Sequence, residues 1–375
     1  PKGSSYFGLC PFHNESTPSF SVSADKQFYY CFGCGESGNV YGFIMKMENC
    51  DFPEAVKRLA DRARIPLPEP EYSAEAARKE KLKQQIYDMH RQAGRYYYAA
   101  LHSRNGEKAL EYLNRRGVEP EIQKKFGIGY APQGRDNLYK YLSSKGFDRE
   151  AMVKSGLVME SKDGRGLYDR FFNRLMFPIF DIQGRAIAFG GRIIDKGEPK
   201  YLNSPETAVF SKSRTLYGMN FAKAARKREI ILVEGYMDMI SIYQAGFPNV
   251  VAGLGTAFNG EHAATLRKLA DSVILLYDSD EAGTRAALRA IPVLVAGGFD
   301  VKVTQVTGAK DADEFIKKYG RDAFGKLIVD AVSYITFRIN VAKKNYNMDN
   351  ADHRVRFAEE AATILAEVPS EIERD

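Results

Sequence analysis

The sequence lacks the features of a membrane protein and of a secreted, disulfide-stabilised domain. No apolar run in its 375 residues approaches the ~18 that a membrane-spanning helix needs, and no secretory signal is visible. It has only four cysteines, three of them within residues 10–34, whereas disulfide scaffolds are shorter and denser in cysteine. We therefore expect metal-ligating cysteines in a reducing, cytoplasmic compartment. The chain begins at Pro1 rather than methionine, so we expect a segment to precede it.

Internal repeats, low-complexity tracts and the phosphate-binding pattern G-x-x-x-x-G-K-[ST] are also absent, which excludes a fused helicase motor of the Walker type. Excess charge is small, since 54 Lys and Arg face 48 Asp and Glu, giving a net charge of +6. This balance permits an acidic partner such as nucleic acid without requiring one. The length is sufficient for two or three domains with cores of their own.

Composition divides the chain into five segments, and we predict an α/β multidomain protein. Residues 1–66 carry the clustered cysteines, and residues 67–85 form a proline-rich linker that runs into a charged, solvated helix. Residues 86–225 mix helical patterns with short strands, and residues 226–320 alternate strands and helices. Residues 321–375 are helical in pattern.

The 226–320 segment has the clearest rhythm. Its apolar runs "EIILV", "NVVAGLG", "SVILLYD" and "DVKVTQV" indicate strands, and a helical pattern follows each of them. Alternation at this spacing predicts βαβ units and a parallel sheet. The nearly continuous apolar character of the runs indicates strands that are buried on both faces.

Two short chelating pairs predict a zinc site. "CPFH" supplies Cys10 and His13, "CFGC" supplies Cys31 and Cys34, and seventeen residues separate the two pairs. Three thiolates and one imidazole make a closed tetrahedral site, and a β-hairpin between the pairs would form an antiparallel zinc ribbon. The alternative is a set of reduced, buried cysteines, which would not explain the matching histidine. Cys50 lies outside the pattern and is expected to be a small core residue.

Aromatic residues of the ribbon leave two interpretations open. Phe28, Tyr29, Tyr30 and Phe32 alternate beside Lys26, a pattern that suits stacking on single-stranded nucleic acid. The same alternation would also fill the small core of a ribbon. Half of these rings must face inward in either case.

Carboxylates follow three of the predicted parallel strands, where ligands bind in open α/β sheets. They are Glu234, Asp238, Asp278, Asp280, Asp311 and Asp313. Clustered carboxylates repel and raise one another's pKa, and Mg²⁺ or Mn²⁺ relieves that repulsion. For single residues the alternative is structural: Asp280 and Asp311 could be helix N-caps, and Glu234 could satisfy a helix N-terminus.

At these acids the sequence resembles a known family. Glu234 after one apolar strand and the Asp278-x-Asp280 pair after another resemble the TOPRIM domain of primases, topoisomerases and some nucleases. "CPFHNESTPSFSV…CFGCGESGNVYGFIM", "RFFNRLMFPIFD", "AFGGR" and "PKYLNSPETAVFSKSRTLYG" are similar to the zinc-binding and basic polymerase regions of bacterial DNA primases. The resemblance covers about residues 1–340, and its several motifs are independent of one another.

The resemblance implies Mg²⁺- or Mn²⁺-dependent synthesis of short RNA primers from nucleoside triphosphates on single-stranded DNA, by a cytoplasmic monomer at the bacterial replication fork. It implies one structural zinc, Asp278 and Asp280 as main metal ligands, and Glu234 as ligand or base supported by Asp238. Asp311 and Asp313 would be lesser ligands. The basic middle of the chain, rich in interleaved aromatics, suits phosphates and unpaired bases. The resemblance places the following residues beside the metal site: Arg170, Arg174, Arg192, Lys200, Asn203 and Lys212.

Family members also have a helical start before the zinc domain and a C-terminal domain that binds the replicative helicase. We expect both to lie outside this sequence. Two other classes stay open. A topoisomerase or nuclease would share the acids, although a topoisomerase needs a nucleophilic tyrosine in a further domain. A non-catalytic module would bind single-stranded DNA without metal or triphosphates.

Overall fold

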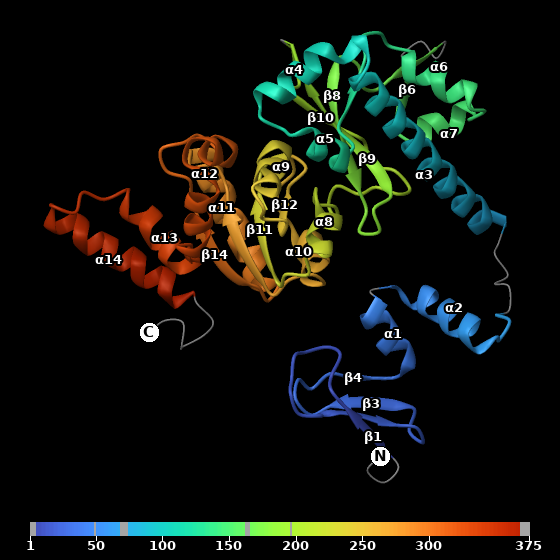
Figure 1. Ribbon diagram of the computed structural model, residues 1–375. Coiled ribbons are helices and arrows are strands. Elements are labelled where there is room, and N and C mark those ends of the chain that lie inside the picture. The colour runs from blue at the N-terminus through green and yellow to red at the C-terminus, as the bar shows by residue number, and fades with distance from the viewer. Residues whose placement is uncertain (1–4, 49, 68–73, 162–165, 196, 368–375) are drawn as a thin grey trace. The chain divides into compact units, whose positions relative to one another are not determined.

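A computed structural model describes residues 5–48, 50–67, 74–161, 166–195 and 197–367. The chain divides into two compact units, Pro1–Ala77 and Arg78–Asp375 (Figure 1). We call the first the N-terminal unit and the second, which contains the acids predicted from the sequence to bind metal, the catalytic unit. The predicted α/β multidomain architecture, with an antiparallel ribbon, a mixed basic region, a parallel sheet and C-terminal helices, is confirmed.

The N-terminal unit is a small antiparallel sheet followed by two helices. Its elements are β1 (Ser5–Gly8), β2 (Phe20–Ser23), β3 (Phe28–Cys31), β4 (Ser37–Gly38), α1 (Val40–Glu48) and α2 (Phe52–Ala63). The strands pair in chain order, so the predicted hairpin is present as β2 and β3. Its core is little more than an aromatic cluster in which the rings of Phe20 and Tyr29 lie 5.2 Å apart. So few buried apolar groups leave the unit dependent on a further source of stability.

The first half of the catalytic unit surrounds a second antiparallel sheet. Its elements are α3 (Ala74–Leu101), η1 (Arg104–Gly106), α4 (Glu107–Arg115), α5 (Pro120–Phe126), β5 (Gly129–Ala131), α6 (Asn137–Ser144), α7 (Arg149–Lys154), β6 (Val158–Glu160), β7 (Leu167–Asp169), β8 (Arg174–Phe180), β9 (Ala186–Ile193), β10 (Tyr201–Asn203) and α8 (Met219–Ala225). The sheet has the order β10-β9-β8-β5, and β6 pairs with β7 separately. Helix α3 buries Ile86, Met89, Ala93 and Tyr97 at helical spacing, which packs one face of it on the sheet.

The second half of the catalytic unit contains the predicted parallel sheet. Its elements are β11 (Glu229–Val233), α9 (Tyr236–Gln244), β12 (Val250–Ala252), α10 (Gly260–Arg267), β13 (Ser272–Leu276), α11 (Glu281–Ala296), β14 (Asp300–Thr304), α12 (Ala312–Val329) and β15 (Val332–Ser333). The order is β12-β11-β13-β14-β15, and only the edge strand β15 is antiparallel among the described strands. Helix α12 crosses the predicted boundary at residue 320, where Gly320, with φ +82°, interrupts the helical backbone.

Both faces of the parallel sheet are buried, as predicted. Along β11, Ile231 and Val233 pack in one cluster with α9 and α12, whereas Ile230 and Leu232 pack in another with α10 and α11 (Figure 1). Successive strand residues point to opposite faces, so a strand between two helical layers must be apolar throughout. This arrangement leaves the carboxyl ends of the strands as the open edge.

Two further helices follow the sheet. Helix α13 (Tyr334–Lys343) and helix α14 (Ala351–Ala366) pack on each other through Ile335, Ala342 and Ile364. Among the described residues, no helix has the length and apolar character to span a membrane.

His90 of α3 should make the stability of the catalytic unit depend on pH. It is fully buried, and this burial lowers the pKa of its imidazole to about 4, below the ordinary value of 6.5. The unfolded chain therefore binds the proton more readily, and folding loses stability as pH falls from 6.5 toward 4. Between pH 7 and pH 5 this loss amounts to about 2 kcal/mol in the free energy of unfolding.

Urea unfolding of the catalytic unit at the two pH values measures this loss. Asp238, whose pKa is raised to about 7, changes stability in the opposite direction over this range, so each variant is compared with wild type. Relative to wild type, His90→Leu should gain about 2 kcal/mol in the free energy of unfolding between pH 7 and pH 5, whereas His102→Leu, at an exposed position on the segment after α3, should follow wild type. Equal pH dependence in wild type and His90→Leu would contradict the assignment.

Candidate functional site

The four predicted zinc ligands meet in the N-terminal unit. Cys10 and His13 lie between β1 and β2, and Cys31 and Cys34 lie at and just beyond the end of β3. All four ligand atoms lie within 4.8 Å of one another, with Cys10 Sγ 3.9 Å from Cys34 Sγ and Cys31 Sγ 3.8 Å from His13 Nδ1. Zinc–sulfur bonds of about 2.3 Å in a tetrahedron place neighbouring sulfurs ~3.8 Å apart. The donor set and its spacing therefore fit one structural zinc ion.

Hydrogen bonds favour the thiolate form of Cys31. Burial raises the pKa of this thiol, but the contact with the Ser19 side chain and hydrogen bonds from the amides of Cys34 and Gly33 lower it to about 6. Gly33 also has a steric role, because a Cβ there would lie 2.7 Å from His13 Nε2. Only glycine fits between the two chelating pairs at this point.

Glu15 supports the zinc centre and was not singled out from the sequence. Its carboxylate accepts hydrogen bonds from the Cys10 amide at 2.7 Å and from the Ser19 amide and hydroxyl, and it lies 3.3 Å from His13 Nε2. The Ser19 hydroxyl contributes most to lowering the pKa of Glu15. A carboxylate on the distal nitrogen of a metal-ligating histidine fixes the orientation of the ring. The sequence signal for this role was an acidic residue two positions after the ligand His13.

The ribbon aromatics divide between the core and the surface. Tyr29 is 4% exposed and lies in the core, whereas Phe28, Tyr30 and Phe32 are 43%, 40% and 68% exposed. The Phe32 ring lies 4.9 Å from Tyr30 and 6.4 Å from Phe7 of β1. We call Phe7, Phe28, Tyr30 and Phe32 the aromatic face. Cys50 lies outside the zinc centre, as expected, but it is half-buried and is not part of the core cluster, contrary to expectation.

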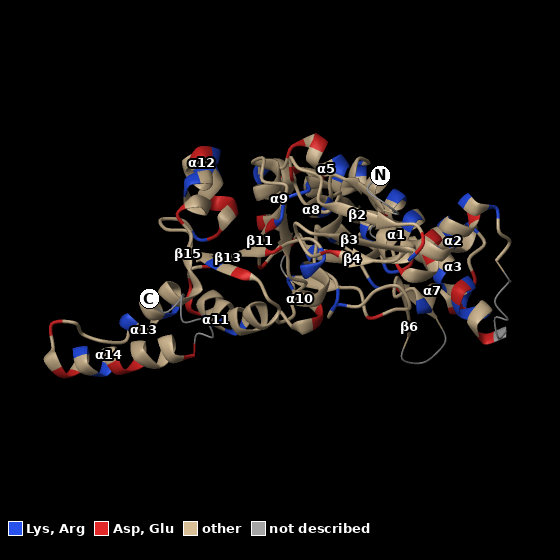
Figure 2. Ribbon diagram, turned by 90° about the horizontal axis from the view of Figure 1, so that it is seen from below, with Lys and Arg blue, Asp and Glu red and all other residues tan. Residues whose placement is uncertain are grey.

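Glu234 and Asp278 come together at the open edge of the parallel sheet. Glu234 directly follows β11, and Asp278 lies two residues beyond the end of β13, the neighbouring strand. Glu234 Oε1 accepts a hydrogen bond from the Asp278 amide at 3.1 Å. Figure 2 shows acidic positions beside β11, β13 and α12. We call the six predicted acids the acid rim.

The acids of the rim perturb one another. Desolvation contributes most to raising the pKa of Glu234, followed by the charges of Asp278 and Asp280. Burial, followed by the charges of Asp311 and Asp280, raises the pKa of Asp278. The pKa of Asp238 is raised to about 7, first by burial and then by the charges of Asp311 and Asp278. Mutual repulsion of this kind is what a divalent cation relieves.

Three acids of the rim also have structural partners. The side chain of Asp280 accepts from the Gly283 amide at 2.7 Å, and that of Asp311 accepts from the Glu314 amide at 2.8 Å, so both cap helices. Asp313 is buried and forms ion pairs with Arg116 and Lys317. Within the described parts of the chain, only the zinc ligands bring three or more donor atoms within 4.8 Å, so the rim is more open than the zinc centre.

Asn203 and Arg170 are engaged within the protein. Asn203 Nδ2 donates to the carbonyl oxygen of Leu254 at 2.6 Å, and its Oδ1 accepts from the Tyr236 hydroxyl at 2.7 Å. Arg170 Nε and Nη2 both donate to the Asn203 carbonyl oxygen. These bonds connect β10 to the β7–β8 loop, to α9 and to the loop after β12. The prediction of Asn203 as a donor beside the metal site did not include these partners.

The other predicted basic residues differ in exposure. Arg174 is 6% exposed, and its Nη1 donates to the carbonyl oxygens of Gly191 and Pro199. Arg192 lies between the rings of Tyr112 and Tyr201, at 4.9 and 5.3 Å. Lys200 is exposed, and Lys212 is half-buried. Among the contacts of the described residues, only Lys200 and Lys212 of this set have a charged group without a hydrogen-bonding or aromatic partner.

A small cleft beside Glu234 was not predicted. It has a volume of about 230 Å³ and is lined by Thr256, Phe258, Tyr277 and Arg289 among others. The charge of Arg289 acts to lower the pKa of Glu234. The sequence offered no signal for it, since the lining comes from four separate segments.

Family models match most of the chain. Residues 1–75 match a model described as CHC2 zinc finger, residues 96–223 match DNA primase catalytic core, N-terminal domain, and residues 231–316 match Toprim-like. Residues 335–375 match DnaB-helicase binding domain of primase. The expectation that a helicase-binding domain lies outside this sequence is therefore wrong, and α13 and α14 fall within the matched range.

Curated relatives and solved structures agree with these matches. A DNA primase from Clostridium acetobutylicum is 44% identical, and the match covers 100% of this chain and 62% of the relative. A DNA primase from Pseudomonas aeruginosa is also 44% identical, and the match covers 86% of this chain and 50% of the relative. The chain thus spans less than two thirds of their length. The zinc-binding and RNA polymerase domains of Aquifex aeolicus primase are 34% identical, with a TM-score of 0.67, over 100% of this chain and 88% of that one. A DnaG primase catalytic domain bound to ssDNA is 33% identical, with a TM-score of 0.68, over 79% and 96%.

Proposed function

Because the chain belongs to the bacterial DNA primase family, we propose that it synthesises short RNA primers on single-stranded DNA by metal-dependent nucleotidyl transfer. The observation that carries this proposal is the placement of Glu234 and Asp278, hydrogen-bonded at the open edge of a parallel sheet. Substrates would be nucleoside triphosphates, and the cell compartment would be the bacterial cytoplasm.

We propose Asp278 and Asp280 as the main ligands of Mg²⁺. When bound, Mg²⁺ neutralises triphosphate charge and stabilises in-line displacement at the α-phosphorus. Asp238 and Asp311 strengthen the negative field that attracts the cation. Asp313, held by Arg116 and Lys317, is better suited to fixing α12 than to direct ligation.

Glu234 is suited to accept the proton of the attacking 3′-hydroxyl. Its raised pKa makes the carboxylate a stronger base than an ordinary glutamate. The Asp278 amide fixes one of its oxygens, which leaves the second oxygen to contact substrate or metal. Both roles, base and ligand, remain part of the proposal.

The template would cross the basic surface near β10. Lys200 and Lys212 offer side chains for phosphates, and Arg192 is oriented by its two tyrosines. Arg170 and Arg174 donate hydrogen bonds to the carbonyl oxygens of Asn203 and Gly191 in this region. Their positive charges would also attract the phosphates of the template. The complex of a similar catalytic domain with ssDNA supports the proposal.

The exposed aromatic face should contribute to binding of single-stranded DNA. Base stacking on an aromatic ring is worth about 1–3 kcal/mol per base, so Phe32→Ala should weaken binding by roughly 5- to 150-fold. Phe52→Ala, at another exposed aromatic of the same unit, is the control and should bind as the wild type does. Fluorescence anisotropy of a labelled oligonucleotide measures both, and equal affinity for Phe32→Ala and wild type would contradict the role.

Residues 335–375 would provide part of the contact with the replicative helicase, since they match the helicase-binding family model. Helices α13 and α14 supply the described part of this surface.

Synthesis of labelled RNA on single-stranded DNA tests the proposed function. We expect short products that require both the template and Mg²⁺ and that disappear when EDTA is added. DNA binding without any product, in the presence of Mg²⁺ and all four triphosphates, would favour the non-catalytic alternative.

A further inference from the structure

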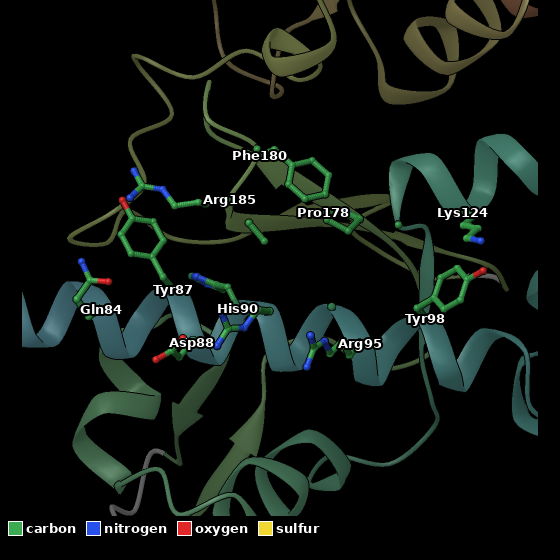
Figure 3. Close-up of a pocket in the computed structure, with 15 residues that line it drawn as sticks. Gln84, Tyr87, Asp88, His90, Arg95, Tyr98, Lys124, Pro178, Phe180 and Arg185 are labelled. Carbon is green, nitrogen blue, oxygen red and sulfur yellow. Dashed lines mark hydrogen bonds and ion pairs between the residues drawn. The ribbon is translucent and has the colours of Figure 1, made fainter. Parts of the chain in front are cut away.

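A second cavity of the catalytic unit lies away from the acid rim. It has a volume of about 550 Å³ and is lined by α3 on one side and by β8 with the β8–β9 turn on the other (Figure 3). We call it the α3 cavity. None of its lining residues belongs to the acid rim or to the predicted basic set. Its volume lies within the range of small-molecule sites.

Flat apolar groups form the walls of the α3 cavity. Tyr87 and Tyr98 lie on α3, and Pro178 and Phe180 lie across from them on β8 (Figure 3). Gly94 leaves space between them, since a Cβ there would meet only Phe189 Cζ, at 3.9 Å. Such walls suit a planar ring that is stacked or sandwiched between them.

Positive charge surrounds these walls. Arg91, Arg95, Lys124 and Arg185 line the cavity, against the single acid Asp88. Arg91 pairs with Asp88 at 2.7 Å, and Arg185 pairs with Asp181 at 2.7 Å while its guanidinium lies 4.2 Å from the Tyr87 ring centre. In the described part of the chain, no ion pair joins Arg95 or Lys124 to an acid, so both can hold an external anion.

We propose that the α3 cavity binds a small anion with a planar aromatic ring, of the size of a mononucleotide. The ring packs between α3 and Phe180, and Arg95 with Lys124 holds the anionic group. A mononucleotide and a non-nucleotide aromatic acid share this chemistry. The site is separate from the acid rim, so its occupancy can be measured without primer synthesis.

Titration of the zinc-loaded full chain with 8-anilinonaphthalene-1-sulfonate, followed by fluorescence, tests the site. Gly94→Leu adds a side chain that fills the cavity, and leucine favours a helix more than glycine does. We expect the Kd of the probe for Gly94→Leu to be about tenfold or more above that for wild type. The matched control is Ala99→Leu, at an exposed position of the same helix, and its Kd should stay within about twofold of wild type. Circular dichroism verifies that both variants are folded.

Charge reversal gives a second, independent readout. Arg95→Glu changes an exposed residue and should weaken binding by about tenfold without affecting the fold. Competition with GMP then distinguishes the two classes of ligand. If GMP displaces the probe, the site binds a nucleotide; if the probe stays bound, the site binds a non-nucleotide aromatic acid. Wild-type affinity in both Gly94→Leu and Arg95→Glu would overturn the proposal.

Discussion

Replacing Asp278 with asparagine is expected to reduce primer synthesis by about 10³-fold while leaving binding of single-stranded DNA unchanged. Asparagine has the same shape as aspartate but lacks the charge that attracts a divalent cation. A bound metal stabilises transition-state charge by several kcal/mol, and about 4 kcal/mol corresponds to the expected loss. Labelled primer products, quantified at saturating template and triphosphates, measure the change.

The substitution should leave the structure of the acid rim intact. The hydrogen bond to Glu234 comes from the backbone amide of Asp278, which asparagine retains. Removing one negative charge also relieves repulsion, so we expect the variant to be at least as stable as wild type in the absence of metal.

Asp322→Asn is the matched control, since Asp322 is an exposed aspartate of α12 outside the acid rim. It should retain wild-type activity. Calorimetric titration with Mn²⁺ gives a readout apart from activity and should show weaker binding in Asp278→Asn alone. Primer synthesis within threefold of wild type in Asp278→Asn would remove this residue from the proposed mechanism.

Loss of the zinc centre is expected to unfold the N-terminal unit. Cys31→Ala removes a ligand that is fully buried at the end of β3. Structural zinc contributes about 10 kcal/mol or more to folding in small domains. The aromatic cluster of this unit is too small to replace that contribution. The catalytic unit has cores of its own and should retain its unfolding transition.

Zinc content per chain and limited proteolysis with trypsin measure this effect. In Cys31→Ala we expect no bound zinc and rapid cleavage within residues 5–67, with the catalytic unit left intact. Cys50→Ala is the control, because Cys50 is half-buried, lies outside the zinc centre, and its thiol donates a weak hydrogen bond to the Ile44 carbonyl oxygen at 3.8 Å. A Cys31→Ala variant with full zinc content and wild-type resistance would show that another residue completes the site.

The sequence alone determined the zinc centre, the strands of the parallel sheet and the position of Glu234 and Asp278. The ligands were predictable because each chelating pair is local in sequence, and a hairpin is the short route that brings two such pairs together. The strands were predictable because burial on both faces requires a continuous apolar run. Once the strands were parallel, Glu234 and Asp278 had to meet at one edge.

The tertiary structure alone decided which polar side chains are engaged inside the protein. Asp313 is held by Arg116, Asn203 by Tyr236 and Leu254, and Arg174 by two carbonyl oxygens. The α3 cavity likewise combines a helix with distant strands. These partners come from separate segments, so no local pattern contains them. Which partner a polar group finds depends on how the segments pack, since burial forces each group to be satisfied by whatever lies beside it.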